Sequence, residues 1–286
     1  MKKITIAWLY PNLMSIYGDY GNVLTLKKRI EWRGIKTEIL EINFDNTIKL
    51  QKVDIILMGG GQDRQQAIVV QDMLNNKRKI LQEAHQKGIP GLFACGGYQL
   101  LGHFYHPLCD DEFNEFNPAN FEKKMSSFKF TPGKGADIPG LKIFPQYTIH
   151  YGNKKPRCIG NIVTEINNEF QTEINKISKP VTTLVGFENH GGRTYFLSGK
   201  DKNLGKVIKG WGNNGEDETE GIVSNNFLGT YLHGFLIKNP HVADFLISKA
   251  LEIKYGETKI QPLDDSLEWQ THEKVKDLVL NKSKNF

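Results

Sequence analysis

The amino-acid sequence predicts an α/β fold in which helices cover both faces of a mostly parallel sheet. Short apolar runs alternate with stretches of helical spacing over the first hundred residues, which is the order of parallel strands joined by crossover helices. The runs are apolar throughout, as expected for strands that are buried on both faces of a sheet. With 286 residues, 39% of them hydrophobic, the chain is long enough to bury the core of one large domain.

The first half of the chain supplies these elements in alternation. Asp19 precedes the first helix and is expected to cap it, and Gly34 is expected to end it. The third strand runs directly into Gly59-Gly60-Gly61, and the long helix after it is expected to break near Asn75-Asn76. Strands are expected at residues 4–9, 35–42, 53–58 and 89–94, and helices at 20–33, 63–88 and 96–105.

The second half contains strand patterns separated by Gly and Asn turns, and we expect these strands to belong to the same sheet. They fall at residues 157–166, 181–197 and 205–234. An amphipathic helix begins at Asn239-Pro240, and the polar tail at about 257–286 is expected to end in one more short helix. Because neither a repeat nor a linker divides the chain, we predict a single domain over residues 1–286.

One stretch departs from this pattern. Residues 103–150 are rich in Asn, Phe, Gly and Pro and have weak periodicity, so we predict an insertion at about 106–150. A lid, a docking surface and a plain surface loop remain alternatives for it.

Charge and cysteine content narrow the class of protein. The net charge is +5, but the basic residues are scattered, except for Lys27-Lys28-Arg29 and Lys77-Arg78-Lys79, which we interpret as solvated helix faces. A nucleic-acid partner is therefore not expected. Three cysteines without C-x-x-C spacing predict neither a disulfide framework nor a metal site, and they suit the reducing cytoplasm.

The first ten residues, "MKKITIAWLY", imitate a signal peptide. The apolar run stops at Pro11-Asn12 and no small-residue cleavage site follows, so we interpret it as a first buried strand. No stretch approaches the roughly 20 apolar residues of a membrane-spanning helix. The sequence predicts a cytoplasmic protein that is not an integral membrane protein.

Cys95, in "PGLFACGGYQLLG", lies between an expected strand and an expected helix. Gly96 and Gly97 permit a tight turn, and the helix N-terminus favours the thiolate form of a cysteine placed there. The Gly96 N–H would face the oxyanion that forms when a carbonyl is attacked. From this string alone, a nucleophile elbow and a small buried cysteine are equal alternatives.

Gly59-Gly60-Gly61 follows a strand at the carboxyl edge of the expected sheet, where ligands of parallel sheets bind. Its amides are candidates for the other half of an oxyanion hole. A phosphate-binding loop is the rival, but neither G-x-x-x-x-G-K-[ST] nor G-x-G-x-x-G occurs. The chain is therefore not expected to bind ATP through a standard loop.

A cysteine nucleophile needs an imidazole partner. Of the eight histidines, His190 in "FENHGG" and His233 in "TYLHG" follow strand patterns. Both fall where an α/β sheet places its active site, whereas His150 belongs to the insertion. A structural or solvated role is the usual alternative for a single histidine.

Together, the motifs "GGGQDRQQ", "PGLFACGGYQLLG", "VGFENHGGRTY" and "GTYLHG" resemble the class I glutamine amidotransferases of the cobyric acid synthase-like branch. The resemblance extends to the glutaminase subunits of bacterial lipid II isoglutaminyl synthases, through "YGDYGNVLTLKKR" and "GWGNNGEDETEGI". It covers most of residues 4–105 and 157–250, but neither the insertion nor "NNEFQTEINKISKP". It implies the flavodoxin-like fold of that class.

The resemblance implies a role for six residues. Cys95 would attack the side-chain amide of glutamine, and His233 would act as base and then as the acid that protonates ammonia. Arg157, aligned across an insertion, would pair with the substrate carboxylate. Gly60 and Gly96 would form the oxyanion hole, and Gln99 would orient the substrate, with a buried structural glutamine as the alternative.

Two further residues have weaker assignments. Asn189 and His190 are candidates for lining the pocket, and a turn-forming role is an equal alternative for both.

One departure from the wider class concerns His233. Ordinary members read H-P-E, where the Glu orients the His, whereas here Gly234 and Phe235 follow. The sequence thus indicates a dyad in which nothing fixes the imidazole tautomer. We therefore expect an acid from a partner subunit to complete the site.

The resemblance implies a glutaminase subunit that hydrolyses L-glutamine and supplies ammonia to a Mur ligase-like partner, MurT, in a heterodimer. The partner would use ATP and Mg²⁺ to amidate D-glutamate in the stem peptide of lipid II at the inner membrane face. No cofactor is expected in this chain. A glutaminase for another acceptor, a γ-glutamyl hydrolase and a non-catalytic docking protein remain alternatives.

Overall fold

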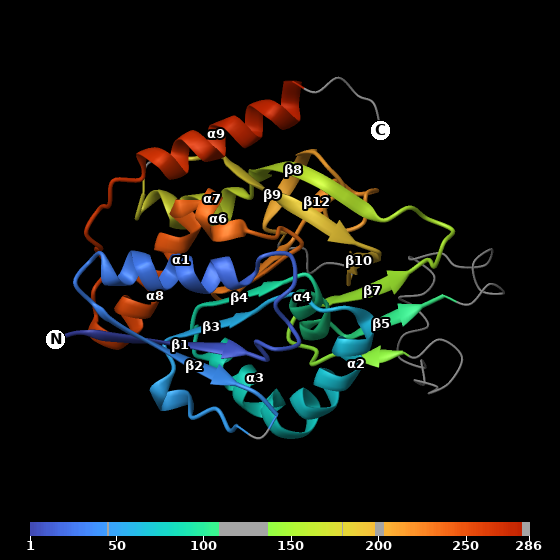
Figure 1. Ribbon diagram of the computed structural model, residues 1–286, viewed down its shortest axis with the longest axis horizontal. Helices are drawn as coiled ribbons and strands as arrows, with labels where there is room; N and C mark the ends of the chain where they lie inside the picture. The colour runs from blue at the N-terminus through green and yellow to red at the C-terminus, as the bar shows by residue number, and fades with distance from the viewer. Residues whose placement is uncertain (45, 109–136, 179, 198–202, 282–286) are drawn as a thin grey trace.

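The structure is a computed structural model that describes the chain except for residues 45, 109–136, 179, 198–202 and 282–286. A six-stranded sheet lies at its centre, in the order β13-β14-β4-β3-β1-β2 (Figure 1). All neighbouring strands are parallel except the edge pair β13 and β14. Its strands are β1 (Lys3–Leu9), β2 (Lys36–Ile42), β3 (Ile55–Met58), β4 (Gly91–Ala94), β13 (Ile222–Ser224) and β14 (Phe227–Thr230).

Helices cover both faces of this sheet, as the sequence predicts. Consecutive residues of β3 enter opposite cores, since Ile55 and Leu57 pack on one face and Ile56 and Met58 on the other. The first face carries α1 (Tyr20–Glu31), α6 (Asn168–Asn175), α7 (Phe235–Lys238) and α8 (Pro240–Tyr255). The second carries η1 (Leu50–Lys52), α2 (Asp63–Asp72), η2 (Met73–Lys77) and α3 (Arg78–Gln86).

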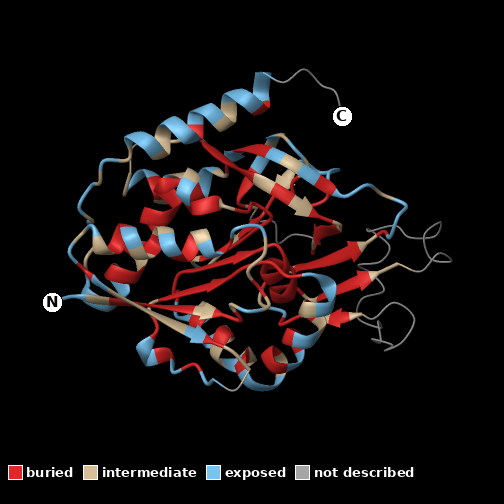
Figure 2. Cartoon of the chain, in the orientation of Figure 1, coloured by how far each residue is buried: buried red, intermediate tan, exposed pale blue. Residues whose placement is uncertain are grey.

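Burial explains why the central strands are apolar throughout. Every residue of β3 and β4 is buried, and Figure 2 shows these central strands in red, whereas the edge strand β2 is largely tan and pale blue. The break expected near Asn75-Asn76 is confirmed as η2, a π-helical turn between α2 and α3.

Most strands of the second half do not join this sheet, and the expectation that they would is wrong. One four-stranded sheet has the order β10-β7-β5-β6, and another has the order β12-β11-β8-β9. An alternating pattern indicates a strand but not its partner, because pairing is made by the backbone. Their strands are β5 (Phe104–Pro107), β6 (Ile138–Pro139), β7 (Gln146–His150), β8 (Cys158–Ile166), β9 (Thr183–His190), β10 (Gly192–Phe196), β11 (Gly205–Lys209) and β12 (Thr219–Glu220).

The bounds of the helix after Cys95 and of the insertion also differ from those expected from the sequence. The helix after Cys95 is only α4 (Gly96–Leu101), and the predicted insertion begins and ends in strands β5, β6 and β7. Its centre, at 109–136, lies outside the described residues. The tail helix α9 (Ser266–Asn281) has 16 residues and is longer than the short helix expected, and it lies over β8 and β9, where Val279 packs against Val163 and Val185 (Figure 1).

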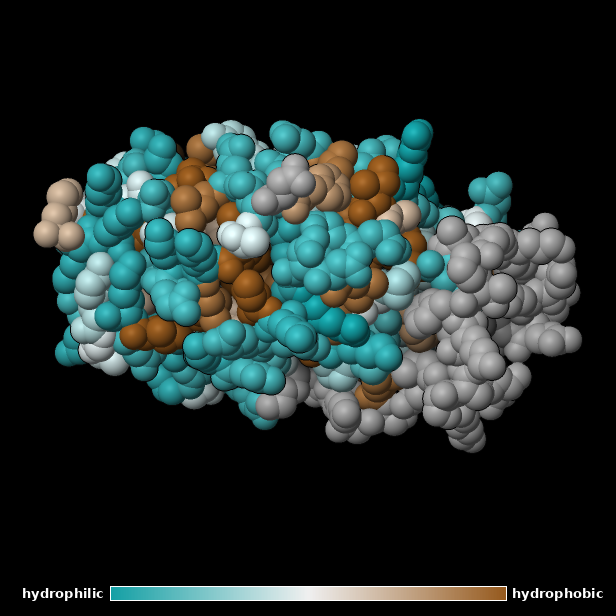
Figure 3. All heavy atoms as spheres, turned by 90° about the horizontal axis from the view of Figure 1, so that it is seen from below, coloured by the Kyte–Doolittle hydropathy of each residue, from teal (hydrophilic) through white to brown (hydrophobic). Residues whose placement is uncertain are grey.

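The underside of the molecule in Figure 1 is shown in Figure 3, where hydrophilic side chains predominate among the described residues and hydrophobic ones lie between them. This follows from the amphipathic pattern of helices such as α3, which buries Leu81 and Ala84 and turns its charged residues outward. Within the described part of the chain, none of the helices combines the length and apolar character that crossing a bilayer requires.

Each basic cluster that we interpreted as a solvated helix face contains a buried cation. Lys77 is fully buried and forms an ion pair with Asp72, whose carboxylate also accepts a hydrogen bond from the Tyr10 hydroxyl at 2.6 Å. Arg29 has a side chain only 2% exposed, enclosed by two carboxylates. Burial of an arginine is favourable only when such partners are present.

The Arg29 cluster connects three parts of the chain. Its Nε donates to Asp244 Oδ1 in α8 at 2.9 Å, and its Nη2 donates to Asp265 Oδ2, just before α9, at 2.9 Å. Arg33 donates to the other oxygen of Asp244 at 2.8 Å. The first helix therefore holds the C-terminal segment against the domain through charge as well as apolar packing.

We predict that Arg29→Ala lowers the free energy of unfolding by about 3–5 kcal/mol, because it leaves Asp265 without the arginine that binds it and Asp244 with Arg33 alone. Urea unfolding followed by circular dichroism measures this. Lys28→Ala, on the exposed side of the same helix and paired with Glu31 at 3.3 Å, is the control, with an expected change of less than about 1 kcal/mol. Equal effects of the two substitutions would contradict the structural role of the cluster.

Candidate active site

Cys95 occupies the strand–turn–helix elbow between β4 and α4. Its backbone has φ +48° and ψ −107°, a conformation that residues other than glycine rarely adopt. The two glycines after it are required by close packing: a Cβ on Gly96 would lie 2.9 Å from the Gly61 nitrogen, and one on Gly97 would lie 3.0 Å from the Gly59 oxygen. The triglycine turn and the elbow therefore lie directly against each other.

His233 lies beside this elbow, although it is far from it in the sequence. Its backbone N–H donates to the Phe187 carbonyl at 2.7 Å, which ties the segment after β14 to β9. A Cβ on Gly60 would lie 3.1 Å from both the Cys95 Cβ and the His233 Cε1. Gly60 thus contacts both side chains, and the structure brings together the two residues that the sequence paired.

An acid of the same chain orients His233. Asp19 Oδ1 lies 3.0 Å from His233 Nδ1, and both side chains are at most 2% exposed. The inference that this chain lacks such an acid is therefore wrong. The acid follows the first strand rather than His233, so the local motif gave no signal for it.

Asp19 also differs from its predicted role as a helix cap. It stands at the N-cap position of α1 but has helical angles, and its side chain makes no capping hydrogen bond. Its Oδ2 instead accepts a hydrogen bond from the Gly60 N–H at 2.7 Å. One carboxylate therefore connects the histidine with the triglycine turn.

This contact bears on the predicted oxyanion hole. The Gly60 N–H is engaged by Asp19, so its role as an oxyanion donor stays a prediction and would require that bond to open. The Gly96 amide, at the start of α4, lies next to Gly61. Gly61 is a neighbouring source of a second donor that the sequence did not single out.

Asp19 changes the charge state of His233. Burial lowers the pKa of the imidazole, but the hydrogen bond and charge of Asp19, together with Cys95, outweigh it and raise the pKa to about 10. His233 Nε2 makes no hydrogen bond in this structure. At neutral pH the ring is therefore an imidazolium with one N–H free to serve a ligand beside Cys95.

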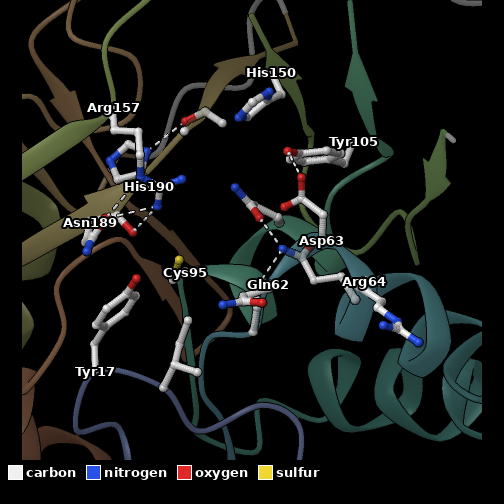
Figure 4. Close-up of a pocket in the computed structure, with 16 residues that line it drawn as sticks. Tyr17, Gln62, Asp63, Arg64, Cys95, Tyr105, His150, Arg157, Asn189 and His190 are labelled. Carbon is white, nitrogen blue, oxygen red and sulfur yellow. Dashed lines mark hydrogen bonds between the residues drawn. The ribbon is translucent and has the colours of Figure 1, made fainter. Parts of the chain in front are cut away.

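A cavity of about 510 Å³ adjoins Cys95. In Figure 4, Arg157, Asn189 and His190 lie on one side of it, Asp63 and Tyr105 on the other, and Cys95 between them. The cavity lies at the carboxyl ends of the central strands, the edge at which the sequence placed the site. Its lining residues are Ile16, Tyr17, Gly61, Gln62, Asp63, Arg64, Gln66, Cys95, Gln99, Tyr105, His150, Arg157, Asn189, His190, Gly191 and Gly192.

Arg157 lines this cavity from the segment just before β8. Its guanidinium donates to Asn189 Oδ1, from Nη2 at 2.9 Å and from Nε at 3.3 Å, and Nη2 also approaches the Asn189 carbonyl at 3.3 Å. Asn189 thus holds the arginine in place at the cavity wall. Arg157 thus shares the cavity with Cys95, and its pairing with a substrate carboxylate stays a prediction.

His190 differs from His233 in charge. It is buried, and burial lowers its pKa to about 3. Its Nδ1 lies 2.7 Å from the Gly192 carbonyl, to which it donates, and its ring stacks on Tyr231 at 3.6 Å. His190 is therefore a neutral wall of the cavity. Its Nε2 lies 3.9 Å from Glu188 Oε2, whereas His233 is within hydrogen-bond distance of its acid, Asp19, at 3.0 Å.

Gln99 lines the cavity but is engaged within the protein. Its Nε2 donates to the Tyr231 hydroxyl at 3.1 Å, and its Oε1 accepts from Gln66 Nε2 at 2.9 Å. These bonds favour the alternative of a buried structural glutamine that supports the wall behind the ligand.

Several cavity residues were missed by the sequence reasoning. Tyr17, 47% exposed and with φ +53°, places its ring edge-on to His233 at 5.0 Å. Asp63 begins α2, and Tyr105 and His150 come from β5 and β7. A signal existed for Asp63, since it follows the triglycine turn by two positions, but the insertion concealed Tyr105 and His150.

Comparison with known proteins agrees with this geometry. Residues 5–241 match the model of the CobB/CobQ-like glutamine amidotransferase domain. The chain is 36% identical to the lipid II isoglutaminyl synthase (glutamine-hydrolyzing) subunit GatD of Staphylococcus aureus, over all of both chains. It is 34% identical to the subunit of that name in Streptococcus pneumoniae, over 96% of this chain and 92% of the other.

More distant similarities agree with these. A cobyric acid synthase of Phocaeicola vulgatus is 27% identical over 87% of this chain and 40% of its own length. Among solved structures, PurLQS from Thermotoga maritima superimposes with a TM-score of 0.52 at 14% identity, covering 88% of this chain and 98% of that one. This last similarity concerns the fold alone.

We predict that Asp19→Asn lowers the pKa of His233 from about 10, because the carboxylate that raises it most is removed and only Cys95 still opposes the effect of burial. The C–H resonances of the His233 ring, followed by NMR across the pH range, measure this change. Glu31→Gln, an acid at the other end of α1, is the control and should leave the titration unchanged.

The raised pKa of His233 also leads to a prediction about how stability depends on pH. A pKa raised in the folded state stabilises the fold fully below the unfolded value and loses that contribution as pH rises through the folded value. The stability difference between wild type and Asp19→Asn should therefore be largest below about pH 6.5 and shrink as pH rises through about 10. A difference independent of pH would contradict the assigned ion pair.

Proposed function

The chain belongs to the CobB/CobQ-like glutamine amidotransferase family, and from this premise we propose that it is a glutaminase subunit. The observation that carries the proposal is the arrangement of Cys95, His233 and Asp19 beside a cavity with an arginine in its wall. A nucleophile, a proton carrier and an orienting acid are the parts that amide hydrolysis by a cysteine requires.

In the proposed reaction, the Cys95 sulfur attacks the side-chain amide carbon of L-glutamine. The sulfur attacks in its thiolate form. His233 carries a proton at neutral pH and gives it from Nε2 to the departing ammonia. A γ-glutamyl thioester remains. Water then gives a proton to His233 and attacks the thioester, which releases glutamate and restores the starting charges.

Asp19 and the glycines act on this chemistry indirectly. Asp19 accepts the Nδ1 proton, so that Nε2 faces the reacting groups, and it stabilises the imidazolium. The Gly96 amide at the helix start, with Gly60 or Gly61 opposite, would stabilise the tetrahedral oxyanion. Arg157 would pair with the substrate carboxylate.

For the partner, we propose a Mur ligase-like subunit, MurT, that receives the ammonia. The names of the two GatD proteins at 36% and 34% identity support lipid II as the acceptor. ATP and Mg²⁺ would bind that partner, which would amidate D-glutamate in the stem peptide at the cytoplasmic face of the membrane. This chain would contribute L-glutamine hydrolysis without a cofactor of its own.

We predict that Cys95→Ala abolishes glutamine hydrolysis, with a loss of at least about 10³-fold in kcat, because Cys95 is the thiol that lines the cavity among the described residues. Release of ammonia from L-glutamine, in the presence of the ligase partner, measures this. A glutamine-like chloroketone should label the wild-type protein and not the variant. Cys158→Ala, at a buried thiol outside the cavity, is the control and should retain both properties.

The acceptor is tested separately. The chain and the ligase partner together should convert lipid II to its amidated form with L-glutamine as nitrogen source, and Cys95→Ala should do so only with added ammonia. Amidation from L-glutamine by the Cys95→Ala complex would count against the assignment of the nucleophile.

A further inference from the structure

The cavity beside Cys95 has walls of opposite charge. Arg157 lies on one wall, ahead of β8, and Asp63 lies on the opposite wall, as the first residue of α2 (Figure 4). An α-amino acid carries one negative and one positive group on the same carbon. The two walls therefore match the two charges of such a ligand when its side chain points to Cys95.

The Asp63 carboxylate is held in place by a hydrogen bond, and it is not paired with a cation among the described residues. Its Oδ2 accepts a hydrogen bond from the Tyr105 hydroxyl at 2.8 Å. Burial and the charge of Asp63 raise the pKa of Tyr105, so the phenol keeps its proton and remains a donor. Among the described residues, no cation forms an ion pair with Asp63, and the neighbouring Arg64 points away from it in Figure 4.

A second donor near Arg157 is His150, whose ring lies 6.1 Å from that of Tyr105, between the two walls (Figure 4). Burial lowers the pKa of His150, so the ring is neutral. The Gly152 N–H donates to His150 Nδ1 at 3.1 Å, which leaves the ring proton on Nε2. A Cβ on Gly191 would lie 2.4 Å from that Nε2 and 3.3 Å from Arg157 Nη1. The two donors therefore converge next to Gly191, where a carboxylate would receive both.

We propose that Asp63 binds the α-ammonium group of glutamine, while Arg157 and His150 bind its α-carboxylate. This proposal rests on the proposed function and names the residue that selects for an amino acid. With the side-chain amide held at Cys95, three groups on one α-carbon meet three fixed partners. Exchange of two of them in the D-enantiomer would place the ammonium on the arginine wall, so the site discriminates in favour of L-glutamine.

The test uses two analogues that each lack one charge. Glutaramate has the carboxylate and the amide but no ammonium, and 4-aminobutanamide has the ammonium and the amide but no carboxylate. Hydrolysis of both and of L-glutamine is measured as kcat/KM for the wild-type protein, Asp63→Asn and Arg157→Gln, each with the ligase partner present.

Asp63→Asn should lower kcat/KM for L-glutamine by about 10- to 100-fold, the loss expected for one hydrogen bond to a charged group. Its kcat/KM for glutaramate should stay at the wild-type value, since that analogue has nothing for Asp63 to bind. Arg157→Gln should give the complementary result, with losses for L-glutamine and glutaramate but not for 4-aminobutanamide. Tyr105→Phe removes only the hydrogen bond that holds the Asp63 carboxylate. It should therefore lower the ratio of kcat/KM for L-glutamine to kcat/KM for glutaramate, as Asp63→Asn does, but by a smaller factor.

The outcomes separate this proposal from the function it rests on. If the wild-type complex does not hydrolyse L-glutamine, the proposed function fails. If it does, and Asp63→Asn reduces hydrolysis of glutaramate as much as that of L-glutamine, the residue is structural and only the assignment of Asp63 is overturned. Unchanged activity of Asp63→Asn toward L-glutamine would overturn that assignment as well.

Discussion

The contact between Asp19 and His233 is the constraint on which the candidate site depends. The two residues are 214 positions apart, and their side chains meet at 3.0 Å in a region closed to water. The other oxygen of Asp19 binds the turn after β3. A single buried carboxylate thus fixes the relative positions of three loops at one edge of the sheet.

The parallel sheet explains why these loops can meet at all. Strands β14, β4, β3 and β1 are neighbours in the sheet, in that order, and all of them run parallel. Their carboxyl ends therefore deliver Asp19, the triglycine turn, Cys95 and His233 to the same edge. The two smaller sheets add the remaining cavity walls, with Arg157 and Asn189 from the β8–β9 pair and Tyr105 and His150 from β5 and β7. Arg157 and His150 thus come from different strands from those that deliver Cys95 and His233, whereas Asp63 follows β3 of the central sheet.

The sequence predicted the parts of this arrangement that are encoded locally. Apolar runs and glycine turns identified the central strands, the elbow at Cys95 and the edge that holds the site. Asp19 was assigned to a helix cap because an acid before a helix usually has that role, and its distant partner leaves no local pattern. Sheet membership was wrong for β8 to β12 since hydrophobic alternation does not identify which strands pair. Lys77 and Arg29 were placed in solvent because the acids that pair with them, Asp72 and Asp244, are recognised only from tertiary structure.

The backbone of Cys95 has a consequence for the whole molecule. Its φ of +48° costs on the order of 1–3 kcal/mol for a residue with a side chain, and a glycine would adopt it without that cost. The fold would therefore be more stable with glycine at the one position where the sulfur is needed. Packing of the two neighbouring glycines against the triglycine turn prevents the elbow from relaxing. The stability of the surrounding sheet therefore holds Cys95 in a backbone conformation that is unfavourable for a residue with a side chain.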